Sequence, residues 1–338
     1  MGKLIGRLIH AKWFQLLVIA ILLIFIINFF NAAFLSRGNV RNLMRGMVVP
    51  GLMMVAVGPL LAGGGIDLAA SANATLGSMV FASMLVAVPG MPWWLAIILA
   101  LMVGAGFGLI NVFFIEKLNF SAFIATISMG TVYAGLARAW TNMNEIMIRN
   151  ETLVWIGRHT LFGDWVPLTF LIMVIIVAIY IYIMARTRFG RSIYMTGGNQ
   201  VAARLAGLNP RRTRAILYIN SGAMATLAGV VWGMQSRMAH PDAIITNLPN
   251  FTALTAVIIG GISFNGGSGT LAAGFIGMIV VRVFENGLMI MGFPPYVSAA
   301  AQGMLLIVAL IIDHINTVRT RKMLESSAMS RARDRVKA

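Results

Sequence analysis

Long apolar runs are the feature that most constrains how this chain can fold. Two examples are FQLLVIAILLIFIINFF (14–30) and VPLTFLIMVIIVAIYIYIM (166–184). At a rise of 1.5 Å per helical residue, about 20 apolar residues cross the ~30 Å hydrocarbon core of a bilayer. Of all residues, 59% are hydrophobic and only 11% are charged, whereas soluble domains carry about 25% charge. The sequence therefore predicts an all-α polytopic membrane protein.

Turn-forming residues divide the chain into about ten predicted transmembrane helices, which form a single domain over 1–338. Glycine and proline clusters such as AGGGID and SFNGGSGT separate the apolar runs. The first run is too long for the apolar part of a signal peptide, and no small-residue cleavage site follows it, so we expect it to be retained. The predicted spans are 13–34, 44–62, 66–88, 92–116, 120–140, 165–186, 211–236, 250–263, 268–288 and 295–313.

The net charge of +16 is unevenly distributed. Basic residues gather at both chain ends and in residues 186–214, where seven arginines occur without an acidic residue. The positive-inside rule explains this distribution without a nucleic-acid partner, and it predicts that both termini and residues 186–214 are cytoplasmic, near lipid headgroups. Arg37, Arg41 and Arg45 would then lie outside. Either that segment lies along the membrane interface, or the first predicted hairpin is wrong.

No motif for catalysis or metal binding is present. The phosphate-binding loop G-x-x-x-x-G-K-[ST] is absent, so any ATP hydrolysis must belong to another chain. The four histidines are widely scattered, H-E-x-x-H is missing, and the lack of cysteine excludes thiolate metal sites. We expect a chain that is not an enzyme and that holds neither a metal nor a cofactor.

The arginine-rich segment contains a short predicted helix over residues 200–206. Gly197 and Gly198 break the chain before it, and Asn199 can cap its first turn. Gly207 and Pro210 end it. An apolar stripe at i, i+4 and i+7 consists of Val201, Leu205 and Leu208. Since so short a helix is unstable alone, it must pack either on the cytoplasmic face of this protein and its lipid, or in a groove of a separate protein.

Two glycine-rich interruptions are alike, GGGIDLAASANATLGSMV and NGGSGTLAAGFIGMIV. Gly-broken spans can mark a solute path, but small residues also allow close helix packing, and both explanations stay open. Both interruptions fall on the same side of the membrane in the span count. Asp67 either lines the path or caps a helix at the membrane surface. The candidate path residues are Asp67, Ser71, Asn73, Phe264, Asn265 and Ser268.

Arg282 and Glu285 are three residues apart and can pair on one helix face. Because they lie toward the end of a predicted span, we expect a solvated pair with a structural role.

Three long motifs resemble the permeases of bacterial ATP-binding-cassette sugar importers, the family of the ribose, xylose and galactose permeases. They are GGGIDLAASANATLGS, GGNQVAARLAGLNPRRTRAILYINSGAMATLAGVV and LTAVIIGGISFNGGSGTLAAGFIGMIVVRVFENGLMIMG, and together they extend over most of the chain. Two departures are Ala69, where the family has serine, and Phe264–Asn265, where its residues are often small or apolar.

The resemblance implies that residues 197–209 contain a coupling helix that docks on an ATPase subunit. Its matching residues are Gly197, Gly198, Asn199, Ala203, Arg204, Leu205, Gly207 and Leu208. It also implies a bacterial inner-membrane location, ATP and Mg²⁺ on the partner ATPase, a second permease copy or a paralogue, and an extracytoplasmic solute-binding protein. The expected function is import of a monosaccharide or similar small polar solute. A secondary transporter driven by an ion gradient is the alternative, although the spans offer few carboxylates beyond Asp67 for ion coupling.

Overall fold

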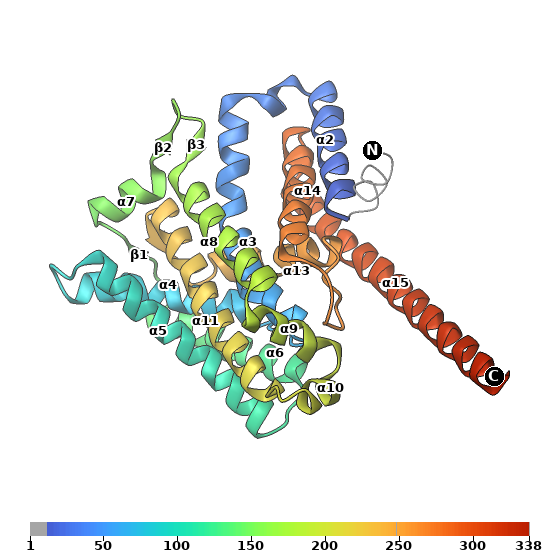
Figure 1. Ribbon diagram of the computed structural model, residues 1–338. Coiled ribbons are helices and arrows are strands. Elements are labelled where there is room, and N and C mark those ends of the chain that lie inside the picture. Colours follow the sequence, from blue (N-terminus) through green and yellow to red (C-terminus); the bar gives the residue numbers. More distant parts are fainter. Residues whose placement is uncertain (1–11, 248, 338) are drawn as a thin grey trace.

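The computed structural model describes residues 12–247 and 249–337. It is a helical bundle (Figure 1), in which four two-residue strands are the only β-structure among those residues. The elements are α2 (Lys12–Phe30), η1 (Ala32–Leu35), α3 (Arg37–Ala62), α4 (Ala70–Ala87), α5 (Trp93–Val112), η2 (Phe113–Lys117), α6 (Ala122–Trp140), β1 (Ile146–Met147), α7 (Glu151–Arg158), β2 (Thr160–Leu161), β3 (Val166–Pro167), α8 (Leu168–Arg186), α9 (Arg188–Gly198), α10 (Gln200–Leu205), α11 (Pro210–Ser236), β4 (Met238–Ala239), α12 (Ala243–Asn247), α13 (Pro249–Ile259), α14 (Leu271–Ile290) and α15 (Pro295–Lys337).

Within the described residues, nine helices are long and apolar enough to cross a membrane. The predicted all-α polytopic class is confirmed, but two of the ten predicted spans are corrected. The span predicted over 250–263 is α13, whose 11 residues cover only about half of a ~30 Å hydrocarbon core. The span predicted over 66–88 is also shorter, because α4 begins at Ala70 after an irregular segment over residues 63–69.

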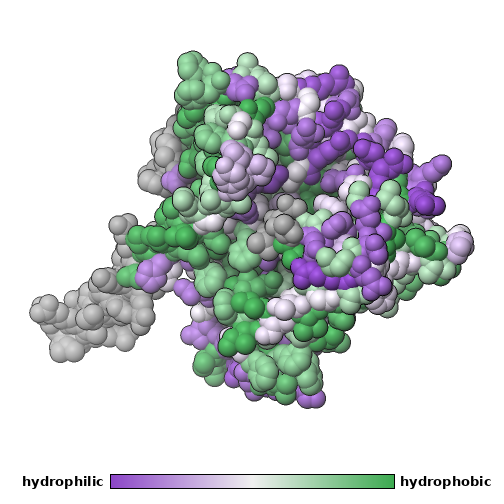
Figure 2. All heavy atoms as spheres, turned by 180° about the vertical axis from the view of Figure 1, so that it is seen from behind, coloured by the Kyte–Doolittle hydropathy of each residue, from purple (hydrophilic) through white to green (hydrophobic). Residues whose placement is uncertain are grey.

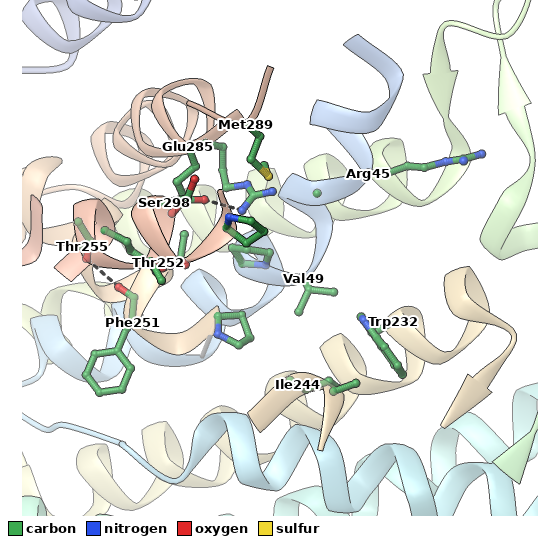
Figure 3. A pocket seen from close by; sticks show the side chains of 18 of the residues that line it. Arg45, Val49, Trp232, Ile244, Phe251, Thr252, Thr255, Glu285, Met289 and Ser298 are labelled. Atoms are coloured by element: carbon green, nitrogen blue, oxygen red, sulfur yellow. Dashed lines mark hydrogen bonds and ion pairs between the residues drawn. The ribbon is translucent and has the colours of Figure 1, made fainter. Parts of the chain in front are cut away.

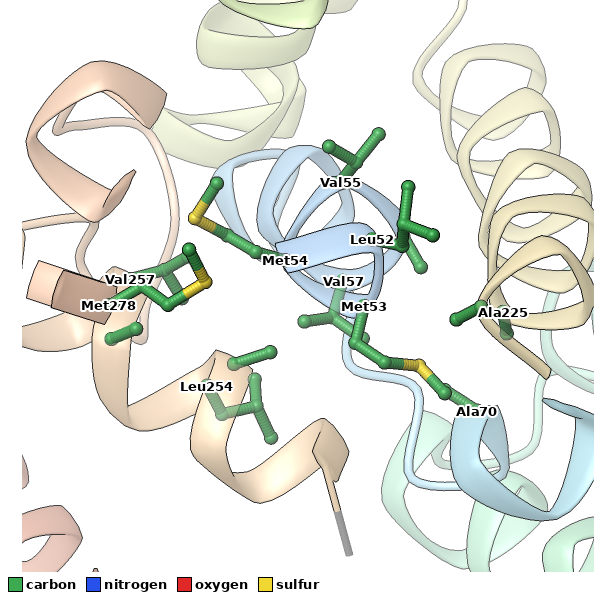
Figure 4. Close-up of a cluster of buried hydrophobic side chains, with 14 of the residues drawn as sticks. Leu52, Met53, Met54, Val55, Val57, Ala70, Ala225, Leu254, Val257 and Met278 are labelled. Atoms are coloured by element: carbon green, nitrogen blue, oxygen red, sulfur yellow. The ribbon is translucent and has the colours of Figure 1, made fainter. Parts of the chain in front are cut away.

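Helix α3 forms the centre of the bundle. Every residue from Met47 to Ala62 is buried. Figure 4 shows its Leu52, Met53 and Met54 between α4 and α11 on one side and α13 and α14 on the other. An apolar helix that is buried all round its circumference fixes the positions of its neighbours, and these neighbours carry the segments of functional interest.

Other helices expose apolar side chains. Of the residues in the 18-residue apolar stretches of α2, α5, α6, α8 and α15, only 6–28% are buried. The side chains of Phe25 and Phe29 are more than 70% exposed. Seen from behind in Figure 2, hydrophobic residues cover much of the lower half of the molecule, while hydrophilic residues gather at the upper right. In a bilayer such apolar faces contact lipid.

The bundle has two chemically different ends. We call the end that carries α9 and α10 the cationic end, since it presents most of the arginines of 186–214; Lys12, at the start of α2, also lies there, beside Gly261. The opposite end carries α7 and two short antiparallel strand pairs, β1 with β4 and β2 with β3.

Arg37, Arg41 and Arg45 lie at this opposite end, in the first turns of α3. Arg41 pairs with Asp164, and Arg45 donates a 3.0 Å hydrogen bond to the carbonyl of Arg158. A hydrogen bond from Thr160 and the pair with Arg41 hold the pKa of the Asp164 carboxyl below its usual value. The first predicted hairpin is present as α2 and α3 joined through η1, and residues 158 and 164 supply partners for Arg45 and Arg41, two of the cations that did not fit the charge rule.

Candidate functional site

The short helix of the arginine-rich segment is α10, as predicted. The side chain of Asn199 caps it by accepting hydrogen bonds from the N–H groups of Val201 (2.9 Å) and Ala202 (3.0 Å). Gly207 has a φ of +80°, a left-handed conformation in which glycine avoids the strain that a Cβ would cause. The N–H of Leu208 then bonds to the carbonyl of Ala203 at 3.0 Å, which closes the helix end.

One face of α10 packs on the protein and the other is exposed. Ala203 is 1% exposed, whereas Val201 is 66% and Leu205 is 86% exposed. Arg204 is also exposed, and Leu208 is half-buried beside it. The predicted stripe is thus not covered by the described part of the chain. Packing of Val201 and Leu205 on the described part of this protein is excluded, which leaves lipid headgroups or a groove on a separate protein as the alternatives for this helix.

The glycines that precede α10 touch both glycine-rich interruptions. A Cβ on Gly197 would overlap the carbonyl oxygen of Ala62, at the end of α3. Gly64 lies against Gly197, and Gly266 lies against Gly64. We call this contact of residues 62–64, 197–198 and 266–267 the glycine junction. Its three segments meet backbone to backbone because their glycines carry no side chains.

A hydrogen bond strengthens the glycine junction. The N–H of Gly267 donates to the carbonyl of Ala62 at 2.8 Å, and both Gly266 and Gly267 have positive φ. The prediction that the two interruptions lie on the same side is confirmed. Close packing through small residues explains their glycines at this point, and residues 197–198 lie directly against the end of α3 and the loop before α14.

The cationic end also holds a buried ion pair. Arg214, in the first turns of α11, makes two hydrogen bonds to the carboxylate of Glu116 in η2, at 2.6 and 2.9 Å. Their side chains are only 16% and 8% exposed. This bidentate pair fixes the start of α11, directly after residues 197–209, to the end of α5.

Asp67 lies in the interior of the bundle, not at a surface. Its carboxylate accepts hydrogen bonds from the Ser221 hydroxyl (2.6 Å) and the Ala69 N–H (2.9 Å), and the residue is 1% exposed. Ser221 is near the middle of α11. The alternative of a helix cap at the membrane surface is therefore wrong. Asp67 instead organises the irregular segment before α4, to which the Tyr218 hydroxyl also donates, at the carbonyl of Ile66.

Ser71 and Asn73 make buried polar contacts too, and together with those of Asp67 we call them the interior network. The Ser71 hydroxyl donates to the side-chain oxygen of Asn250 at 2.6 Å, and the Thr226 hydroxyl donates to that of Asn73 at 3.1 Å. The first turns of α4 and α13 thus meet inside the bundle. Helix α4 begins there because the glycine-rich irregular segment over residues 63–69 precedes it, and protein covers its exposed backbone end, as a membrane interior requires.

Phe264, Asn265 and Ser268 lie elsewhere, in the loop between α13 and α14 at the cationic end. All three are exposed. The backbone N–H of Phe264 donates to Asp313 of α15 at 3.0 Å. The structure therefore separates the six candidate path residues into an interior network and an exposed loop.

A large cavity lies between α3, α11, α12, α13, α14 and α15, near the opposite end (Figure 3). Its volume is about 760 Å³. None of the six candidate path residues lines it. Arg282 and Glu285 pair as expected, at 2.6 Å, but the predicted solvated position is wrong, because their side chains are 18% and 7% exposed and line this cavity.

Few sequence features point to the other cavity residues. Trp232, Thr252 and Gln302 stand on three helices and approach one another only in the folded bundle. The spacing of Arg282 and Glu285 was the one sequence feature that indicated an interacting pair at this site.

Comparisons with known proteins show the family of the chain. Residues 42–310 match the family described as branched-chain amino acid transport system / permease component. The chain belongs to this family. The ribose import permease RbsC of Bacillus subtilis (strain 168) is 31% identical over 294 residues, which cover 86% of this chain and 89% of that protein.

Two further relatives have similar coverage. The probable ABC transporter permease YphD of Escherichia coli (strain K12) is 29% identical over 93% of this chain and 92% of that protein. The L-arabinose transport system permease AraH of the same organism is 29% identical over 91% and 92%. No solved structure matches the chain.

The protein is therefore a multi-pass membrane permease component of a bacterial ABC transport system, a transport subunit and not an enzyme. The resemblance noted in the sequence is confirmed. Membership in this permease family favours the ATP-driven alternative over the one driven by an ion gradient. ABC import permeases work with an ATPase and a solute-binding protein. The exposed stripe of α10 is therefore a candidate contact surface for such a partner.

Proposed function

We propose that this permease imports a monosaccharide or a similar small polar solute and that α10 couples it to a separate ATPase. The observation that carries the coupling proposal is the exposed apolar face of α10. Val201 and Leu205 are 66% and 86% exposed on a helix that is capped at both ends and fixed by the glycine junction. An apolar helical face of this kind fits a groove on another protein.

The glycine junction supports transmission of movement from the ATPase. A push on α10 reaches Ala62 and Gly267 directly, because no flexible side chain separates Gly197 from them. Closure of the ATPase on ATP would then shift the end of α3 together with the loop before α14. Arg214 and Glu116 would carry the same displacement to α5.

The cationic end is expected to face the cytoplasm, with both termini there. The partners we propose are two ABC ATPase subunits, which hold ATP and Mg²⁺, a second permease copy or a paralogue, and an extracytoplasmic solute-binding protein at the opposite end. No cofactor is expected on this chain. The sugar class rests on relatives named for ribose, fructose and L-arabinose transport.

The test compares Leu205→Asp with Phe162→Asp. Both residues are highly exposed, 86% and 75%, but Phe162 lies at the opposite end. Neither variant should lower the thermal unfolding temperature of the purified permease, since neither side chain is buried. An ATPase that carries the phosphate-binding loop should co-purify with the wild type and with Phe162→Asp, but not with Leu205→Asp. Equal recovery with Leu205→Asp would refute coupling through α10.

ATP-dependent uptake of radiolabelled D-ribose, D-fructose and L-arabinose by cells tests the solute class separately. At least one of these sugars should accumulate, and Leu205→Asp should abolish that accumulation. If cells with the wild-type permease accumulate none of them, the sugar assignment fails even where the ATPase binds.

A further inference from the structure

The cavity near the opposite end has the size of a small-molecule site. Its volume of about 760 Å³ lies within the range of roughly 300–1,000 Å³ typical of such sites. Trp232 and Gln235 reach it from the last turns of α11, Met289 comes from the end of α14, and the first turn of α13 forms its floor. It therefore lies in the half of the bundle remote from the glycine junction.

Unpartnered polar atoms concentrate in this cavity. Among the described residues, ten buried side-chain nitrogen or oxygen atoms have no hydrogen-bond partner. Four of them belong to residues that line the cavity: Arg45 Nε, Arg282 Nε, Glu285 Oε1 and Ser298 Oγ. The Glu285 side chain is only 7% exposed. Because buried polar groups in folded proteins are almost always satisfied, the spare hydrogen-bonding capacity of Arg282, Glu285 and Ser298 beside the cavity favours a polar occupant.

The charges of the lining favour a neutral occupant. Arg282 and Glu285 neutralise each other through their 2.6 Å ion pair. Gly46 makes room for the guanidinium of Arg282, since a Cβ there would overlap its Nη2. Arg45 is directed away from the other labelled side chains in Figure 3 and donates to the carbonyl of Arg158. An anion would meet the Glu285 carboxylate, and a cation would meet Arg282.

The remaining side chains fit a molecule with several hydroxyl groups. A hydroxyl both donates and accepts hydrogen bonds, and the Arg282–Glu285 pair offers a donor and an acceptor side by side. Gln302 donates to the Thr252 hydroxyl, and Gln235 donates to Thr169 at 2.9 Å, so these amides are held in place. The indole of Trp232 adds a flat apolar face with negative potential, suited to the C–H face of a sugar ring.

We infer that this cavity binds a neutral monosaccharide on its way through the permease, with Arg282, Glu285, Ser298 and Thr252 contacting the hydroxyls and Trp232 contacting the ring. The inference rests on the proposed sugar import and assigns that solute a site in this chain. It also moves the solute contact away from Phe264, Asn265 and Ser268. A lipid chain or an apolar helix of a second copy would leave the polar groups of Arg282, Glu285 and Ser298 without hydrogen-bond partners, which disfavours both.

The absence of cysteine from the chain allows a direct test of occupancy. Ser298→Cys places one thiol in the cavity, and Met143→Cys places one on an exposed turn at the same end. The rate of modification by a charged methanethiosulfonate is measured on each purified variant in detergent, with D-ribose, D-fructose, L-arabinose or sodium sulfate added. At least one sugar should slow modification of Ser298→Cys severalfold and leave Met143→Cys unchanged.

Other outcomes contradict the inference. If sulfate protects Ser298→Cys and no sugar does, the cavity is an anion site. If no addition protects it, or if both thiols are slowed equally, the cavity does not bind the sugar.

A second measurement separates this inference from the proposed function. Trp232→Ala should raise the KM of sugar uptake severalfold while the ATPase still co-purifies, and Trp232→Phe, which keeps an aromatic face, should recover most of the affinity. If the wild type accumulates no sugar, the proposed function fails. If the wild type imports sugar while Trp232→Ala keeps its KM and Ser298→Cys is unprotected, only the cavity assignment fails.

Discussion

At the scale of single residues, glycine decides the geometry of the cationic end. Gly197 is in contact with the backbone of two other segments, at Ala62 and Gly267. Its conformation is ordinary, so the need for glycine arises from space and not from φ. Gly266 and Gly267 combine both reasons, because they have positive φ and lie against backbone atoms. The smallest side chain is thus required on all three sides of one contact.

Gly197→Ala should therefore destabilise the protein. Its Cβ would overlap the Ala62 carbonyl, and forcing extra atoms into a packed site costs about 1–3 kcal/mol. We expect a lower thermal unfolding temperature in detergent and slower sugar uptake. Gly135→Ala, a helical position with no atom within 4 Å of the added Cβ, is the control and should lower neither, because alanine favours a helix over glycine. Unfolding temperatures that agree between Gly197→Ala and the wild type would contradict the backbone contact.

At the scale of elements, α10 shows how a short helix can be stable. Six residues are too few to form a helix alone in water. Asn199 satisfies the N–H groups at one end, Gly207 closes the other, and Ala203 packs the helix on the protein. The exposed stripe therefore costs no folding stability to present, and substitutions on it report on partner binding alone.

Asn199→Ala should loosen α10 without disturbing the bundle. Loss of an N-cap costs about 1 kcal/mol of local helix stability. Hydrogen exchange of residues 200–205 should become faster, and less ATPase should co-purify, while exchange in α3 stays as in the wild type. Asn199→Asp keeps the accepting oxygen and serves as the control, with exchange near that of the wild type. Unchanged exchange in Asn199→Ala would show that tertiary packing holds α10 without its cap.

At the scale of the whole molecule, the two ends carry different structural features. The cationic end carries α10, the glycine junction and the Arg214–Glu116 pair. The opposite end carries the strand pairs and the cavity. There Arg41 pairs with Asp164, and Arg282 pairs with Glu285. Solute and ATPase would then act on opposite halves of the same helices, with buried α3 as the shared element.

Two single-cysteine variants test this orientation in whole cells. Met143→Cys, at the opposite end, should react with a membrane-impermeant thiol reagent added outside intact cells. Leu205→Cys should react only after the membrane is permeabilised, because positive loops remain in the cytoplasm. Both positions are highly exposed, so access of the reagent is not limited by burial. The reverse labelling pattern would place the cationic end outside and remove the basis for ATPase coupling.

The sequence by itself determined most of the membrane-spanning helices, the caps of α10 and the permease family. These depend on local pattern: run length against bilayer thickness, a capping side chain beside free N–H groups, and motifs in order. Interior positions could not be obtained in this way. The glycine clusters at residues 63–65 and 266–267 predict breaks, but which backbones meet at them depends on long-range packing.

Only the tertiary structure decided which polar groups share a site. Asp67, for which the sequence left open a surface cap or a place in the solute path, is buried and bonds to Ser221, more than 150 residues away. Arg282 and Glu285 are neighbours on one helix, but their burial in a cavity depends on α3, α11 and α15 together. Hydropathy fixes how far each helix reaches through the bilayer, whereas the angle at which each side chain faces its neighbours is fixed only when the helices pack against one another.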